Sequence, residues 1–198
     1  YLMADPGYIV DNVLTDPEAW VALDSETISG TVTNITFTSP ADGSSLDWSQ
    51  FMDLVVIAYA RDSASTYYDS YFAIQVNNVT TVGLYPSQWF YGNGSSDTAF
   101  WHDNQYLLAG RFPDGYESDA DVFGSSVTTL FDINSGKWKT ALCQWASDMD
   151  GRGTVGVAAS TAEVQAAITE LDCYFISGGN IVADSRVDLF GVLPRMVA

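Results

Sequence analysis

Hydrophobic and polar side chains alternate most regularly near the C-terminus, over Arg186–Val192. Val187, Leu189 and the backbone of Gly191 fall on one side of this pattern, and a period of two is typical of a strand with one buried face. The preceding Ser177–Asn180 segment, S-G-G-N, predicts a tight turn, because glycine adopts positive φ freely and Asn tolerates it. A strand at this position needs partners already in place, so the pattern predicts an all-β domain closed by its last segment.

The same kind of pattern predicts strands along most of the chain. Thr31–Thr38 is rich in β-branched residues and alternates around Ile35 and Phe37. Asp53–Arg61 is almost continuously apolar, which predicts a central strand covered on both faces. The other predicted strands are Tyr71–Val76, Gln88–Tyr91, Gln105–Phe112, Val127–Ile133, Lys137–Ala146, Thr154–Ala159, Leu171–Ile176 and Asp184–Val192.

The segments between the predicted strands are short and polar. Asn77-Asn78, Gly92–Ser96 and Asn134–Gly136 have the composition of turns, and the last of them joins two strands in a hairpin. Ser160–Glu163 has the form of a capping box, which predicts a short Ala-rich helix ending near Ile168. Short strands separated by turns, with so little helix, indicate an antiparallel β-sandwich or jelly roll.

The first 25 residues follow a different pattern. Pro6 and Pro17 interrupt both a helix and a central strand, so we expect an extended arm over residues 1–25, with at most one helical turn at Pro17, before a jelly-roll domain over residues 26–198. The apolar side chains of the arm have no sustained period; they are Leu2, Tyr8, Ile9, Val13, Leu14 and Trp20. Such apolar surface favours packing on protein, and the sequence leaves open whether the arm covers its own domain or binds a neighbouring subunit.

Composition narrows the possible partners. The chain has 25 Asp and Glu against 7 Lys and Arg, a formal net charge of -18. Phosphate binding requires clustered cations, so nucleic acid is excluded as a partner. No run of about 20 apolar residues is present, so no membrane partner is expected. Cys143 and Cys173 are predicted to be buried thiols, and a single bridge between them is the alternative that their spacing leaves open.

Candidate chemistry is sparse. His102, beside Asp103, is the one histidine, and no G-x-S-x-G turn presents a nucleophile, so we expect a surface histidine and no enzyme activity. Clusters of imidazole or thiolate ligands are excluded by count, and no cofactor is expected. Asp148–Gly153 resembles the start of a calcium loop, but Arg152 stands at a ligand position, which favours a plain hairpin loop. A second, weak calcium candidate consists of Glu117, Asp119 and Asp121.

Aromatic residues flank the Gly92–Ser96 loop on both sides. Aromatic side chains on loops stack on sugar rings, which makes Trp89, Tyr91 and Trp101 candidate glycan-binding residues. Alternating aromatic residues on short strands are, however, more typical of a packed core. Both readings apply to the neighbouring Phe90 and Phe100.

Several segments keep an order and spacing that resemble one known family. They are I-S-G-T-V-T-N-I-T-F-T-S at Ile28–Ser39, D-L-V-V-I-A-Y-A-R at Asp53–Arg61, Q-V-N-N at Gln75–Asn78, G-N-G-S-S at Gly92–Ser96, F-D-I-N-S-G-K-W-K-T at Phe131–Thr140, A-A-I at Ala166–Ile168 and G-N-I-V-A-D-S-R-V-D-L-F-G-V at Gly179–Val192. In this order they resemble tailed-bacteriophage virion proteins built on a single jelly-roll domain. Asn77-Asn78 departs from the Gly-Asp or Asp-Gly turn of that family, and the arm is not covered by the resemblance.

The resemblance implies a structural part of a virus particle without catalytic residues. The first expectation is a capsid decoration (cement) protein, a homotrimer that binds the major capsid protein on the outer surface of the phage head and stabilises it. The alternative is a tail or fibre protein that binds host glycans. A secreted carbohydrate-active enzyme with a sandwich fold is a more remote alternative.

Overall fold

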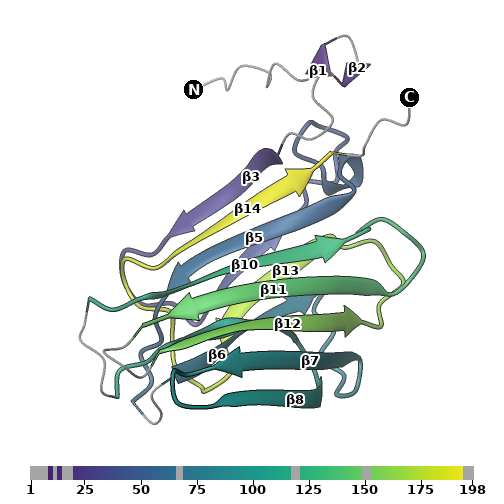
Figure 1. Cartoon of the computed structure of the whole chain (residues 1–198). Coiled ribbons are helices and arrows are strands. Elements are labelled where there is room, and N and C mark those ends of the chain that lie inside the picture. The colour runs from purple at the N-terminus through teal and green to yellow at the C-terminus, as the bar shows by residue number, and fades with distance from the viewer. Residues whose placement is uncertain are drawn as a thin grey trace.

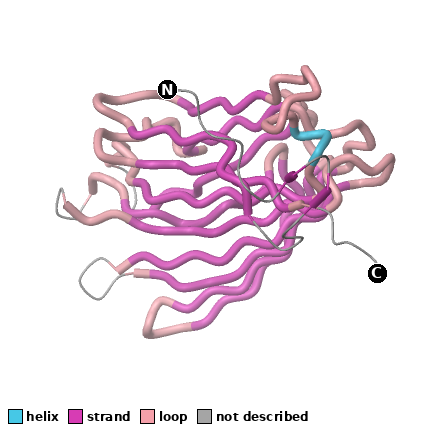
Figure 2. The backbone as a smooth tube through the Cα atoms, turned by 90° about the horizontal axis from the view of Figure 1, so that it is seen from above, coloured by secondary structure: helices cyan, strands magenta, loops and turns pink. Residues whose placement is uncertain are grey.

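A computed structural model describes residues 9–10, 13–14, 20–65, 69–116, 121–148 and 153–193. These residues form two antiparallel sheets packed face to face, which confirms the predicted all-β sandwich (Figure 1). The larger sheet has the strand order β3-β14-β5-β10-β11-β12-β7-β8 and the smaller sheet the order β4-β13-β6-β9. Two short strands, β1 (Ile9–Val10) and β2 (Val13–Leu14), pair only with each other. Viewed along the layers, strands make up most of the trace (Figure 2).

The strand bounds agree with the sequence pattern to within a few residues, except that the sequence pattern does not predict β1, β2, β3 and β8. The larger sheet consists of β3 (Trp20–Thr27), β14 (Arg186–Val192), β5 (Asp53–Ala60), β10 (Gly124–Phe131), β11 (Lys139–Ser147), β12 (Thr154–Ala162), β7 (Tyr85–Gly92) and β8 (Asp97–Asn104). The smaller sheet consists of β4 (Asn34–Thr38), β13 (Glu170–Phe175), β6 (Asp69–Val76) and β9 (Leu107–Pro113).

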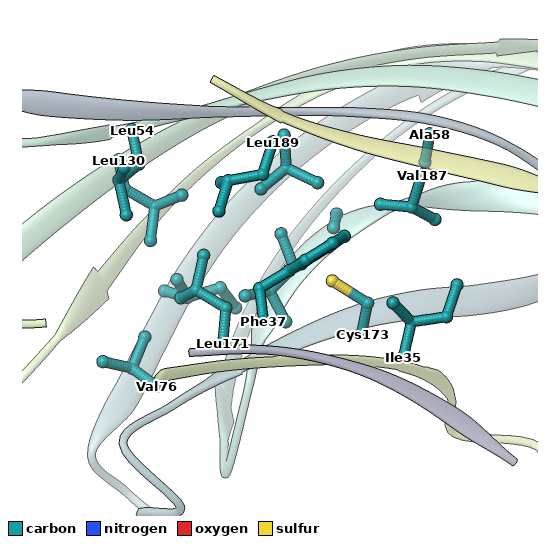
Figure 3. Close-up of a cluster of buried hydrophobic side chains, with 14 of the residues drawn as sticks. Ile35, Phe37, Leu54, Ala58, Val76, Leu130, Leu171, Cys173, Val187 and Leu189 are labelled. Carbon is teal, nitrogen blue, oxygen red and sulfur yellow. The ribbon is translucent and has the colours of Figure 1, made fainter. Parts of the chain in front are cut away.

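The core lies between the two sheets. Leucine, valine and alanine side chains of the larger sheet face aromatic and aliphatic side chains of the smaller one (Figure 3). The labelled residues are Leu54, Ala58, Leu130, Val187 and Leu189 from the larger sheet and Ile35, Phe37, Val76, Leu171 and Cys173 from the smaller. Burying one such Leu or Phe side chain contributes about 1.5–3 kcal/mol, so this layer holds the sandwich together.

The last strand, β14, lies inside the larger sheet, between β3 and β5, as a terminal strand with one apolar face requires. The turn before it is also confirmed, with Gly178 at φ 81°. Gly179 is needed for a different reason, because a Cβ there would overlap the carboxylate of Asp62. That buried carboxylate accepts hydrogen bonds from the Ser177 hydroxyl and the backbone N–H of Ala64, which ties the turn to the end of β5.

The prediction that the Asp53–Arg61 strand is covered on both faces is only partly correct. As predicted, β5 is central, with β14 and β10 as neighbours. Val55 points away from the smaller sheet and is buried, but Tyr59 on the same side is 48% exposed. The smaller sheet covers one face of the larger sheet only, so on its other face the second half of β5 is covered only in part, with Phe123 stacked on Tyr59.

The predicted helix from Ser160 to Ile168 is wrong. β12 continues to Ala162, and the Ser160 hydroxyl lies 2.9 Å from that of Ser87 on β7. The helix in the described residues is instead the single 3-10 turn Trp48–Gln50. Local propensity is therefore overridden by strand pairing.

The backbone beyond β12 is also committed to other segments. The Glu163 N–H donates to the Leu84 carbonyl, and the Ile168 N–H donates to the Ile133 carbonyl. In a helix from Ser160, the Ile168 N–H would donate to the Val164 carbonyl and the Glu163 N–H to the Ser160 side chain. The segment therefore has its hydrogen bonds satisfied in an irregular conformation.

The Lys139 side chain donates hydrogen bonds to two backbone carbonyls of the same segment. It is almost fully buried, and Nζ donates to the carbonyls of Val164 (3.5 Å) and Gln165 (3.3 Å). It also donates to the carbonyls of Lys137 (2.6 Å) and Ser135. Burial lowers the pKa of Lys139. The ammonium group thus joins the β10–β11 hairpin to the chain that follows β12.

Trp20–Ser25, which the sequence pattern places in the arm, form most of the edge strand β3. They are extended, as predicted, but they pair with β14 and belong to the sheet. The sheet therefore begins at Trp20. The predicted helical turn begins at Pro17, and residues 15–19 lie outside the described part of the chain.

Both cysteines are free and buried, which confirms the prediction of two thiols. Burial raises the pKa of Cys143 to about 12 and also raises the pKa of Cys173. Neither sulfur is a thiolate near neutral pH, so neither is a reactive nucleophile.

We predict that Lys139→Met lowers the free energy of unfolding by about 2 kcal/mol, because it leaves buried carbonyls without their charged donor. The matched control is Lys137→Met, since the Lys137 side chain is exposed and should change stability by less than about 0.5 kcal/mol. Urea unfolding followed by tryptophan fluorescence measures both. Equal stability of the two variants would show that the hydrogen bonds of Lys139 to backbone carbonyls contribute nothing to the free energy of unfolding.

Candidate interaction surface

Four adjacent strands of the larger sheet, β10, β11, β12 and β7, carry no charged side chain on the side that points away from the smaller sheet. This side of the four strands is here called the outer face. The outward side chains are Ser125, Val127, Thr129, Phe131, Thr140, Leu142, Gln144, Ala146, Val155, Val157, Ala159, Thr161, Pro86, Gln88 and Phe90. None of them is Asp, Glu, Lys or Arg, in a chain with a net charge of -18. A solvated sheet face usually carries charged side chains, so this composition is typical of a surface that contacts other protein.

The register aligns apolar side chains into bands across the outer face. Ile57, Val127, Gln144, Val157 and Phe90 are paired in sequence from β5 to β7. Directly opposite side chains have Cβ atoms about 4.5–5.5 Å apart, so this row is continuous. It is also accessible, because Phe90 is 53% exposed.

A hollow of about 450 Å³ opens in the middle of the outer face. Its lining includes Ile57 and Val127 on one side, Val155 and Val157 on the other, and Gln144 between them. Because its lining is mainly aliphatic, the hollow suits an apolar side chain of a partner rather than a charged ligand.

Charged residues border the outer face on both sides. Arg186 and Asp188 lie on the same side of the sheet on β14, beyond β5, and Asp97 and Asp103 lie on the edge strand β8. The sequence signal for the surface is the absence of charge at alternate positions of β10, β11 and β12. That signal becomes a surface only when the register is known.

The predicted glycan-binding residues do not share one surface. Trp89 points inward, is 7% exposed and packs against Tyr71 with ring centroids 5.1 Å apart. Tyr91 lies on the same side of β7 as Trp89, whereas Trp101 pairs with Gln88 on the outer side and is 66% exposed. The core reading therefore holds for Trp89, while Trp101 is a surface residue.

Arg111, on β9 of the smaller sheet, contacts the ring of an aromatic residue on β7 of the larger sheet. Its guanidinium carbon lies 4.2 Å from the ring centroid of Tyr91 on β7 and 5.2 Å from that of Tyr71 on β6. One guanidinium nitrogen, Nη2, lies 2.7 Å from Asp69, and the side chains of this ion pair are 12% and 13% exposed. Burial has the largest single effect and lowers the pKa of Arg111, but the charge and hydrogen bond of Asp69, together with Tyr71 and Tyr91, raise this pKa by more, so the net shift is upward. The larger and smaller sheets are thus joined by a buried cation between two rings.

A hollow of about 370 Å³ adjoins this cation, lined by Asp69, Ser70, Tyr71, Arg111, Ile176 and Ser177. The Nε and Nη1 atoms of Arg111 and the Ser70 hydroxyl are buried without hydrogen-bond partners. The rings of Tyr71 and Tyr91 interact with the guanidinium from their faces, so the cation is stabilised without further acceptors.

The catalytic and metal candidates remain isolated. His102 lies on the edge strand β8, exposed, with Nδ1 3.2 Å from the backbone oxygen of Asp103. Within the described residues, no group of three or more His, Cys, Asp or Glu side chains is placed to hold a metal ion. Of the acidic-loop candidate, Asp121 is described and exposed, while Glu117 and Asp119 lie outside the described residues. Residues 149–152 of the other candidate calcium loop also lie outside them.

The predicted partner-binding residues of the arm are only partly described. Leu2 and Tyr8 lie outside the described residues. Ile9, Val13 and Leu14 belong to the β1–β2 pair, of which the backbone is described. Trp20 is 50% exposed, and its ring centroid lies 5.9 Å from that of Phe190.

Among the described residues, no helix has the length and apolar character needed to cross a bilayer. Comparison of the chain with protein-family models, with curated proteins and with solved structures gave no match.

We predict that Arg111→Met lowers the free energy of unfolding by about 2–3 kcal/mol, since it leaves the partly buried Asp69 carboxylate without its partner. The control is Arg186→Met, which removes the ion pair with Asp188 at a side chain that is 57% exposed and should cost less than about 0.5 kcal/mol. Chemical unfolding of both variants checks this expectation. A larger loss for Arg186→Met than for Arg111→Met would contradict the assigned role of Arg111.

Proposed function

We propose that this protein is a structural component of a bacteriophage particle, a head decoration protein that binds other virion proteins and has no catalytic role. The observation that carries the proposal is the uncharged outer face of the larger sheet. The resemblance of the Ile28–Val192 segments to phage jelly-roll virion proteins supplies the biological setting. The major capsid protein is the proposed partner of the outer face.

The outer face suits docking because its burial removes no charge from water. Taking an unpaired charge out of water costs several kcal/mol, whereas apolar surface contributes about 25 cal/mol for each Å² buried. Val127, Leu142 and Val155 are each between 39% and 63% exposed, so their burial is still available to a partner.

The dimensions of the outer face match those of an ordinary interface. Adjacent strands lie about 4.8 Å apart and each residue adds about 3.3 Å, so the four strands from β10 to β7 span roughly 15 Å by 25 Å in projection. Side chains that stand out from this area raise the accessible surface toward the roughly 800 Å² per partner of a standard protein interface.

The acidic residues elsewhere on the chain restrict how the protein binds. With a net charge of -18, copies repel one another and remain soluble until an uncharged surface meets its partner. Asp97 and Asp103 border the outer face and so oppose binding to other acidic surfaces.

We predict that Leu142→Asp weakens binding to purified heads at least tenfold, because it places a charge in the middle of the outer face. Val82→Asp is the matched control, since Val82 is 71% exposed but lies in the loop between β6 and β7, away from this face. Co-sedimentation of each purified variant with heads lacking the protein measures the affinity. Circular dichroism verifies that both variants are folded.

The copy number in intact particles decides between decoration and other virion roles. A decoration protein is expected in hundreds of copies on the head, as counted by quantitative mass spectrometry and located by cryo-electron microscopy. A few copies, or a location on the tail, would rule out head decoration. Binding of Leu142→Asp equal to that of wild type would exclude the outer face as the docking surface.

A further inference from the structure

The free edge of β8 forms a second candidate interface, distinct from the outer face. We propose that β8 of one copy pairs antiparallel with β8 of a second copy, so that two larger sheets join into one continuous sheet. The occupant is thus this chain itself. This inference does not depend on the proposed docking of the outer face on heads.

β8 is a long strand that, among the described residues, is paired on one side only. It spans eight residues, Asp97–Asn104, and β7 is the strand that pairs with it in the described part of the chain. The β7–β8 register runs from Gly92↔Asp97 to Tyr85↔Asn104 without a shift. A straight edge of this length is a template for pairing with another strand.

The two edges of the larger sheet differ in their protection against such pairing. The β3 edge carries Asp24 and Glu26, and its pairing with β14 shifts register between Leu189 and Phe190. Charges and register shifts are common protections of sheet edges. β8 also carries two acids, Asp97 and Asp103, but they lie toward its two ends, its register with β7 has no shift, and its centre is the apolar segment Ala99–Trp101.

Aromatic side chains are exposed on both faces of β8. Trp101 on the outer side is 66% exposed, and Phe100 on the inner side is 48% exposed. A second strand beside β8 covers both rings at once, whereas a ligand on either face reaches only one of them. Aromatic cross-strand pairs are among the more stabilising in sheets.

The positions of the two acids select one register. Extending a sheet about a two-fold axis normal to it places outer residues opposite outer residues. Centring the axis on Phe100 puts Asp97 opposite Asp103 of the other copy, and like charges directly opposite are destabilising. Centring it on Trp101 puts Asp103 opposite Ala99 and keeps residues 98–104 paired. Trp101 then lies opposite its own counterpart.

The expected affinity is modest. Two aromatic residues of roughly 150–250 Å² each, with one strand edge, bury less than the roughly 800 Å² per partner of a standard interface. Both copies carry a charge of -18, so salt screening should strengthen the association. A cationic partner would show the opposite dependence. The pairing is two-fold and closes at two copies, so it differs from the three-fold contact of a trimer.

Disulfide trapping tests the register directly on the full-length chain. Directly opposite residues of an antiparallel pair have Cα atoms about 4.5–5.5 Å apart, within the range that a disulfide spans, so Trp101→Cys should form a covalent dimer under mild oxidation at least tenfold faster than Phe100→Cys. In the proposed register residue 100 faces His102 of the other copy rather than itself. Cys143 and Cys173 are buried and provide no competing thiol. Equal rates for the two variants, or no dimer from either, would overturn the proposal.

Charge substitutions at position 99 test the same register without cross-linking. Ala99→Asp should weaken dimerisation roughly fivefold by facing Asp103, and Ala99→Lys should strengthen it, as measured by sedimentation velocity at several salt concentrations. A dimer that weakens with salt, or a wild-type chain that is monomeric at every concentration, would contradict self-pairing. Leu142→Asp should leave cross-linking through Trp101→Cys unchanged. Loss of that cross-link would instead indicate that the dimer contact lies on the outer face. A chain that is monomeric but still binds heads would contradict self-pairing and leave the proposed function intact.

Discussion

The structure depends on the apolar contact between an eight-stranded sheet and a four-stranded sheet. In the central strands of the larger sheet, the contact buries the side chains of one face, among them Leu54, Leu130 and Leu189. The smaller sheet has too few strands to cover anything else. The other face of the larger sheet and its β8 edge are therefore left over, and their chemistry determines what the molecule can bind.

Two buried cations support this arrangement where apolar packing ends. Lys139 gathers backbone carbonyls at the β10–β11 hairpin, and Arg111 is held between Tyr71, Tyr91 and Asp69. Each joins segments that are distant in the sequence. Arg61 is buried as well, and its Nη2 donates to the carbonyl of Asp114, so at least three of the seven cations of the chain form internal bonds.

An uncharged face and an aromatic edge on an otherwise acidic molecule are compatible with an assembling protein. A partner of the outer face approaches along the normal to the sheet, whereas a strand paired with β8 lies in the plane of the sheet. The two contacts therefore do not compete for the same side chains. A subunit that uses both could bind an underlying surface and a neighbouring copy at once, and several weak contacts then add through avidity.

The sequence by itself determined the fold class, most of the strands, the Ser177–Asn180 turn and the burial of both cysteines. These features depend on local alternation and turn chemistry, which a single sequence displays. It did not reveal β3 or β8, because acids and exposed aromatics on both faces remove the alternation that signals a half-buried strand. Only the tertiary structure decided that Ser160–Ile168 is not a helix and that scattered neutral residues form one surface, since both follow from hydrogen bonds and registers between segments far apart in the chain.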